Sequence, residues 1–152
     1  MQPPSGEPVA LTDQELAAWG GLLRTHARLV RELDAELTLE HRLPLSSYEV
    51  LLRLANSETG GMRMSEIADA VLLSRSGLTR LVDRLEREGL VAREPCNDDA
   101  RGQRAVITEL GRARFSEARV THLAGVRRSF LGRLDARELS QLSRIWRVLE
   151  RA

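Results

Sequence analysis

Residues 97–104, NDDARGQR, place acids and arginines close together in a stretch whose composition is typical of a turn. Within it, Asp99 precedes Arg101 by two residues. Such a loop could bind a metal, supply the acid and base of an active site, be an ordinary solvated turn, or contact a polyanion. The last interpretation has an apparent difficulty, because carboxylates repel phosphates. Which of these four interpretations applies depends on the elements that position the loop.

A second group of polar side chains lies in residues 74–84, SRSGLTRLVDR. Apolar residues recur there at helical spacing, which leaves a polar face opposite them. Arginine can form two hydrogen bonds with guanine, hydroxyls can meet base edges or phosphates, and a helix N-terminus attracts a phosphate. The alternative is a solvated amphipathic helix with ordinary charges. The candidate DNA-contacting residues here are Ser74, Arg75, Ser76, Thr79 and Arg80, with Arg84 one turn further on.

The composition excludes several classes of enzyme. All 23 basic residues are arginine, so there is no Walker A loop, no Schiff base and no pyridoxal chemistry. The chain also lacks a G-x-S-x-G elbow, an H-E-x-x-H helix and a glycine-rich nucleotide loop. We therefore expect no catalytic residue, no enzyme activity and no cofactor. The formal net charge of +1 means that any DNA site must be a local pattern and not a basic lobe.

Nothing in the sequence indicates export or a membrane. The first residues, MQPPSGEPVALTDQ, lack the basic start and apolar run of a signal peptide. No apolar stretch approaches the roughly 20 residues that span a bilayer. Cys96 is the single cysteine, which excludes an intrachain disulfide and a CxxC motif. We expect a cytoplasmic protein with no membrane partner.

Helix start signals organise the chain up to residue 90. Thr12 and Glu15 form a capping box after a tail of residues 1–10, and apolar residues recur at helical spacing to about residue 40. Ser46 as N-cap, with Glu49 three residues later, predicts a second helix. Residues 64–73 and 74–90 predict two helices separated by a tight turn, and Gly89 lies where a helix C-terminus favours a left-handed residue. This layout is typical of a helix-turn-helix.

Strand and helix signals follow in the rest of the chain. Residues 91–94 and 104–108 are rich in β-forming side chains and predict a hairpin whose connection is the NDDARGQR stretch. A long helix is predicted from Thr108 to about residue 132, and a last helix from a capping box of Asp135 and Glu138. The last helix is expected to bury Leu139, Leu142, Ile145, Trp146 and Leu149.

These elements predict a mainly α protein with a small β-hairpin wing. Residues 44–108 would form a winged helix-turn-helix DNA-binding domain, and residues 11–43 and 109–152 a helical dimerisation region built from both termini. The first and last helices carry more apolar residues than a single winged domain can bury, so we expect a second copy of the chain to cover them. Two-fold symmetry would then place both helix-turn-helix units on one side.

From about Leu11 to Leu149 the chain resembles the MarR family of bacterial transcription regulators. Two motifs carry this resemblance together: SRSGLTRLVDRLEREGLV, similar to the family's recognition helix and its exit, and Asp99-x-Arg101-Gly102, which matches the family's D-x-R-G wing motif. The resemblance implies a homodimer that binds a pseudopalindromic operator in double-stranded DNA and usually represses. It also implies, in many members, release of DNA by a small aromatic or anionic effector.

The resemblance and the residue chemistry together suggest a role for each polar side chain. Residues 75, 76, 79 and 80 would read the major groove, while Arg101 would enter or flank the minor groove. Asp99 would orient Arg101 and Gly102 would permit the turn. Arg84 and Arg104 are weaker phosphate candidates. In this scheme the acids of the loop aim an arginine and do not contact DNA.

The sequence does not decide whether the chain has an effector pocket or another kind of sensor. Trp19, His26 and Tyr48 could line a pocket between the first two helices, or could be core or dimer-interface residues. His26, His41 and His122 are too few and too scattered to predict a metal site, and Cys96 is an incidental turn residue or a redox switch. The alternatives are a zinc- or thiol-responsive regulator of the same fold, and a winged-helix protein-interaction module without DNA binding.

Overall fold

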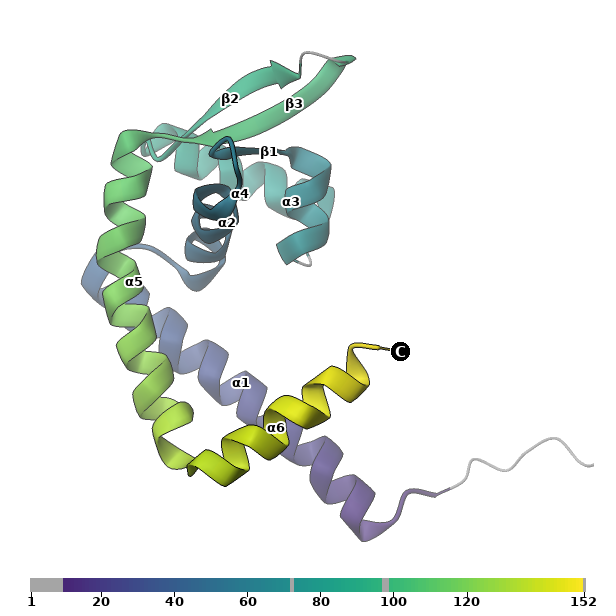
Figure 1. Ribbon diagram of the computed structural model, residues 1–152. Helices are drawn as coiled ribbons and strands as arrows, with labels where there is room; N and C mark the ends of the chain where they lie inside the picture. Colours follow the sequence, from purple (N-terminus) through teal and green to yellow (C-terminus); the bar gives the residue numbers. More distant parts are fainter. Residues whose placement is uncertain (1–9, 72, 97–98, 152) are drawn as a thin grey trace, which may run out of the picture.

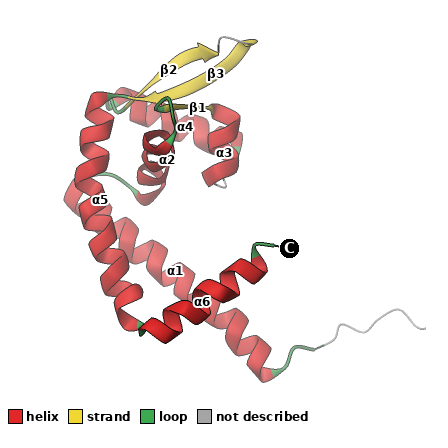
Figure 2. Ribbon diagram, viewed as in Figure 1, coloured by secondary structure: helices red, strands yellow, loops and turns green. Residues whose placement is uncertain are grey.

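The computed structural model describes residues 10–71, 73–96 and 99–151, with the backbone alone for residues 99–101. Figure 1 shows a lobe made of a small sheet and α2, α3 and α4, from which α1 and α5 run away side by side. Helix α6 turns back from the far end of α5 (Figure 2). The elements are α1 (Asp13–His41), α2 (Leu45–Asn56), β1 (Gly61–Arg63), α3 (Met64–Val71), α4 (Arg75–Arg87), β2 (Val91–Cys96), β3 (Asp99–Ile107), α5 (Glu109–Ser129), a 3-10 turn η1 (Leu131–Arg133) and α6 (Ala136–Leu149). The mainly α fold class is confirmed.

The predicted capping boxes start the first and last helices. At α1 the side chain of Thr12 accepts from the N–H of Glu15, and the Glu15 carboxylate accepts from the N–H of Thr12 at 2.8 Å. At α6 Asp135 and Glu138 exchange the same pair of hydrogen bonds, both at 2.8 Å. These boxes satisfy backbone donors that a helix N-terminus leaves free. Both helix starts are therefore local properties of the sequence.

The start of α2 differs from the prediction. The helix begins at Leu45 with Pro44 as N-cap, and no side chain of its own caps it, so the expected N-cap role of Ser46 is wrong. The N–H of Leu45 instead donates to Oδ1 of Asp34 on α1 at 2.8 Å. A carboxylate from another helix supplies the acceptor that a local cap would otherwise provide.

Buried apolar side chains hold the winged lobe together. Leu54 on α2, Ile67 on α3, and Val82 and Leu85 on α4 are fully enclosed. Ala68 at 5% exposure lies in the same core, where its small side chain suits the contact between α3 and α4. The core continues into α5 and the C-terminal half of α1. The apolar face of α4 is thus fixed inward, and its polar face must point away from the lobe.

The hairpin is longer than predicted. Strands β2 and β3 pair antiparallel over nearly all of residues 91–107, and residues 97–98 of the expected turn lie outside the described residues. Gly102 belongs to β3, so the prediction that it permits the turn is wrong. The glycines with positive φ in the described chain are Gly60, at 71°, and Gly89, at 75°. The register shifts between Pro95 and Cys96, opposite the β3 segment that holds Gly102.

A third strand, β1, was not predicted from the sequence. Its residues Gly61–Arg63 pair with β3, which gives the order β1-β3-β2. Three residues are too few for an alternating pattern to be recognised. Gly89 does end α4 as expected, because its left-handed conformation turns the chain directly into β2.

Helix α6 does not bury its apolar face within this chain. Ile145 and Leu149 are 47% and 58% exposed, Trp146 is 37% exposed, and Leu139 and Leu142 are half-buried. The expected burial is therefore wrong for a single chain, because α6 turns away from the far end of α5 (Figure 2) and the described residues bury none of its side chains fully. None of the described helices is both long enough and apolar enough to cross a membrane.

Candidate nucleic-acid interface

The exposed face of α4 carries the predicted DNA-contacting residues. Ser74, Arg75, Ser76, Thr79 and Arg80 are all exposed. The hydroxyl of Ser74 caps the helix by accepting from the N–H of Gly77 at 3.1 Å. The Thr79 hydroxyl donates to the carbonyl of Arg75 at 2.8 Å, which leaves its oxygen lone pairs as acceptors. The polar face of α4 is held in place, because the opposite face of the helix is packed in the core.

A groove separates α4 from the hairpin. Its volume is about 670 Å³. Its walls come from the end of β1, the start of α3, the first turns of α4 and both long strands: Arg63, Met64, Ser65, Arg75, Leu78, Thr79, Arg93, Glu94, Pro95, Cys96, Gly102 and Gln103. Three of these side chains are guanidinium groups and one, Glu94, is a carboxylate. Because Arg93 is ion-paired with Asp83 and Glu86, the exposed guanidinium of Arg75 is the charge on the α4 wall that suits a sugar–phosphate strand.

The two wing residues of the D-x-R-G motif lie on β3. Asp99 pairs with Cys96 in the strand register, and Arg101 follows two residues later. Their side chains lie outside what the structure describes. The orienting role of Asp99 and the DNA contact of Arg101 therefore stay predictions.

Two further arginines considered as phosphate contacts turn toward the protein. Arg84 donates from Nη2 to the hydroxyl of buried Ser47 on α2 at 2.6 Å. Arg104 donates from Nη2 to the hydroxyl of Thr59 at 2.6 Å. In both residues Nε is enclosed without a hydrogen-bond partner among the described residues. These hydrogen bonds direct both guanidinium groups inward.

Arg93 is a residue of the candidate interface that was not predicted from the sequence. It lies on β2, and its guanidinium forms ion pairs with Asp83 at 2.6 Å and Glu86 at 2.7 Å, both on α4. The available signal was the spacing of two acids three residues apart on one helix, followed closely by an arginine on the next strand. Asp83 and Glu86, the two acids of α4, therefore have a partner within the protein.

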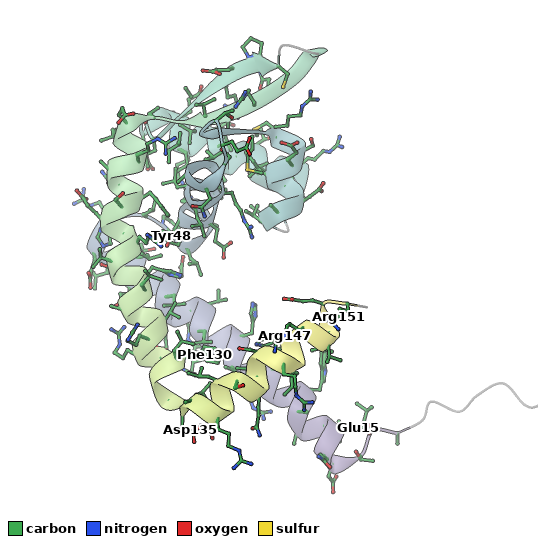
Figure 3. All side chains as sticks on the ribbon, in the orientation of Figure 1. Glu15, Tyr48, Phe130, Asp135, Arg147 and Arg151 are labelled. Carbon is green, nitrogen blue, oxygen red and sulfur yellow. The ribbon has the colours of Figure 1, made fainter. Side chains whose placement is uncertain are left out.

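The three residues considered for an effector pocket differ in their surroundings. Trp19 is 56% exposed and His26 is also exposed, both on α1, whereas Tyr48 is buried (Figure 3). The Tyr48 ring centre lies 5.4 Å from that of Phe115 and 4.5 Å from that of His122. Burial raises the pKa of Tyr48 and lowers the pKa of His122. In this chain Tyr48 packs as a core aromatic between α2 and α5.

The other candidate sensors have ordinary surroundings. His41 shares a hydrogen bond of 2.7 Å with the Thr121 hydroxyl. The described part of the chain contains no group of three or more histidine, cysteine, aspartate or glutamate residues that could hold a metal ion. Cys96 is the last residue of β2 and is buried, so its description as a turn residue is wrong. Its strand extends further than the apolar pattern indicated.

Comparison with known proteins gives one consistent result. Residues 43–102 match the model of the MarR family. Among solved structures, the chain is similar to AbsC from Streptomyces coelicolor, a MarR family transcriptional regulator, with 34% identity, a TM-score of 0.87, and coverage of 95% of this chain and 97% of that one. It is also similar to Sco3205 from the same organism, solved in complex with DNA, with 32% identity, a TM-score of 0.88, and coverage of 96% and 91%.

Proposed function

The chain belongs to the MarR family of transcriptional regulators, and we propose that it acts as a homodimeric repressor on a pseudopalindromic operator. It is a DNA-binding regulator of mainly α fold with a winged helix-turn-helix. The observation that carries the proposal is the exposed row of arginines and hydroxyls on α4, which borders the groove facing the wing. The similar chain Sco3205 was solved with DNA bound, which supports this use of the lobe.

The proposed contacts follow from the exposed chemistry. Arg75 and Arg80 would read base edges in the major groove, since a guanidinium can form two hydrogen bonds with guanine. Ser76 and Thr79 would meet base edges or phosphates from the same face. The backbone strand between the major and minor grooves would lie in the groove beside α4. Arg101 would then reach the minor groove from β3, with Asp99 fixing its direction.

The proposed dimer rests on apolar surface that a single chain leaves exposed. Trp146 and Leu149 on α6, and Leu16 and Trp19 on α1, are between 37% and 58% exposed. Large exposed apolar side chains on two neighbouring regions of a chain are typical of an interface. Closed two-fold pairing would cover them and place both α4 helices on one side of the dimer.

We place an effector site, for a small aromatic or anionic ligand, between the dimerisation helices and the winged lobe. His26 is an exposed residue of α1, and Glu49 lies on α2. Burial raises the pKa of Glu49, with Arg53 and His26 opposing that shift. Tyr48 adjoins this position, and exposed Trp19 lies further along α1. A bound anion would meet exposed His26 and Arg53, whereas Tyr48 is buried in the core and would meet an aromatic ring only after its packing changes.

A nuclease footprint tests the proposed function directly. The purified protein is incubated with DNA from upstream of its own gene over a series of salt concentrations. We expect a protected inverted repeat whose half-sites lie about one helical turn apart, with affinity that falls steeply as salt rises. Absence of sequence-specific protection at low salt would refute the repressor proposal.

A further inference from the structure

Arg93 joins the wing to about two turns of α4, from Thr79 to Glu86. Besides its ion pairs with Asp83 and Glu86, its Nη2 donates to the carbonyl of Thr79 at 3.4 Å. Its backbone N–H donates to Oε1 of Glu86 at 3.3 Å. The contacts therefore involve both the side chain and the main chain of one β2 residue. Strand β2 cannot swing away from α4 without breaking all of them.

The Arg93 guanidinium is better enclosed than the acids that hold it. Its side chain is 17% exposed, against 49% for Asp83 and 43% for Glu86. Burial by itself would lower the pKa of Arg93, but its hydrogen bonds with Asp83 and Glu86 raise it overall. A partly buried, charge-assisted pair of hydrogen bonds stabilises more than an exposed ion pair does.

The position of Arg93 links both parts of the DNA interface. Arg93, Thr79 and Arg75 share the wall of the groove. Strand β2 is in turn paired with β3, which carries Arg101. Fixing β2 on α4 therefore fixes the spacing between the exposed face of α4 and the wing. Both guanidinium ends of Arg93 already bind acids of the protein, so they are not available as free donors to a phosphate.

We propose that Arg93 is a positioning residue for DNA binding, which holds the wing at the spacing from α4 that one operator half-site requires. The inference rests on the proposed function of the α4 face and the wing. Arg93 acts through Asp83 and Glu86 and does not touch DNA. Its second effect is to offset part of the negative charge of two carboxylates at the border of the groove.

The positioning role and surface charge alone predict opposite changes in the affinity for the specific site. Replacing both acids, in the variant Asp83→Ala/Glu86→Ala, makes the surface more positive by two charges and keeps good helix formers on α4. If charge alone governed binding, this variant would bind every DNA more tightly. We call the contacts of Arg93 with Asp83 and Glu86 the clamp. If the clamp positions the wing, the variant binds its specific site more weakly although its surface is more positive.

The binding test uses a duplex that the wild-type protein selects from a random-sequence pool, with a scrambled duplex of equal length for comparison. We expect Arg93→Gln and Asp83→Ala/Glu86→Ala each to weaken binding to the selected duplex by about five- to tenfold. The double variant should bind the scrambled duplex as tightly as the wild type or more tightly. Arg87→Gln is the matched control, since it removes the same charge from α4 as Arg93→Gln removes from β2, and we expect a change below about twofold.

Hydrogen exchange of the free protein tests the clamp without DNA. We expect the backbone amides of β2 and β3 to exchange faster in both clamp variants, while the amides of α2 and α5 keep wild-type rates. Tighter binding of the selected duplex by the double variant, or unchanged exchange in β2 and β3, overturns the positioning role. If instead the wild type selects no sequence while exchange responds as expected, the clamp stands and the proposed DNA function fails.

Discussion

The winged lobe buries its apolar side chains within one chain, whereas the helical end, made of α6 and the exposed part of α1, leaves large apolar side chains exposed. In the lobe, the apolar faces of α2, α3 and α4 meet one another, and residues such as Leu54 and Val82 have no exposed surface. In α6, by contrast, no residue is buried, although its capping box is as well formed as that of α1. A helix can therefore be specified locally while its packing partner lies outside the chain. The difference separates a lobe that can position the proposed DNA-contacting residues from an end whose exposed apolar face we propose a second copy covers.

The strongest test of this contrast is a core substitution in the lobe. Leu54→Ala removes a fully enclosed side chain from α2, and we expect it to lower the free energy of unfolding by about 3 kcal/mol. Leu39→Ala is the control, because Leu39 is 84% exposed and should change stability by less than about 0.5 kcal/mol. Chemical denaturation of both variants measures the difference. Equal losses of unfolding free energy in the two variants would contradict the distinction between a buried and an exposed leucine.

A substitution at the helical end should affect association and leave the lobe folded. Trp146→Glu places a charge on the exposed apolar face of α6, and we expect it to weaken dimerisation by roughly 100-fold or more. Sedimentation measures the change, and circular dichroism checks that the helices remain. Arg147→Glu is the control, since it also adds an acid to α6 and Arg147 is an exposed polar residue. If both variants stay dimeric, this face of α6 is not the interface.

The smallest expected effect concerns the wing. Arg101→Ala should weaken operator binding by about tenfold while the dimer stays intact, because it removes a single groove contact. Asp99→Ala should have nearly the same effect, because an unoriented arginine loses conformational freedom on binding. Gel-shift titrations of the two variants and of the wild type provide the comparison. Unchanged affinity in either variant would refute the proposed mechanism of the wing.

The parts of the fold that follow from the sequence are those set by neighbouring residues. The Thr12 and Asp135 capping boxes and the left-handed Gly89 are each recognisable within four residues, and the structure has all of them. The apolar face of α4 was recognisable from its spacing, which also placed its arginines and hydroxyls outward. These signals were sufficient for the helix order and for one face of the candidate site.

The features that were missed or wrong depend on distant residues. The cap of α2 comes from Asp34 through a contact eleven residues away, so the sequence near Ser46 could not show it. Arg93 acquires its role when the turn at Gly89 brings β2 against α4. Gly102 was assigned to a turn because glycine favours turns, but β-pairing extends past it. Tertiary pairing in these places overrides local preference.

The central claim is that the winged lobe contacts DNA while the helical end joins two copies for a two-fold site. Its most direct test is the affinity of the wild type and of Trp146→Glu for a duplex with the complete inverted repeat and for one with a single half-site. We expect the wild type to bind the complete repeat at least about 100-fold more tightly than the half-site. Trp146→Glu should bind both duplexes with similar, weak affinity. Equal affinity of the wild type for the two duplexes would contradict the account.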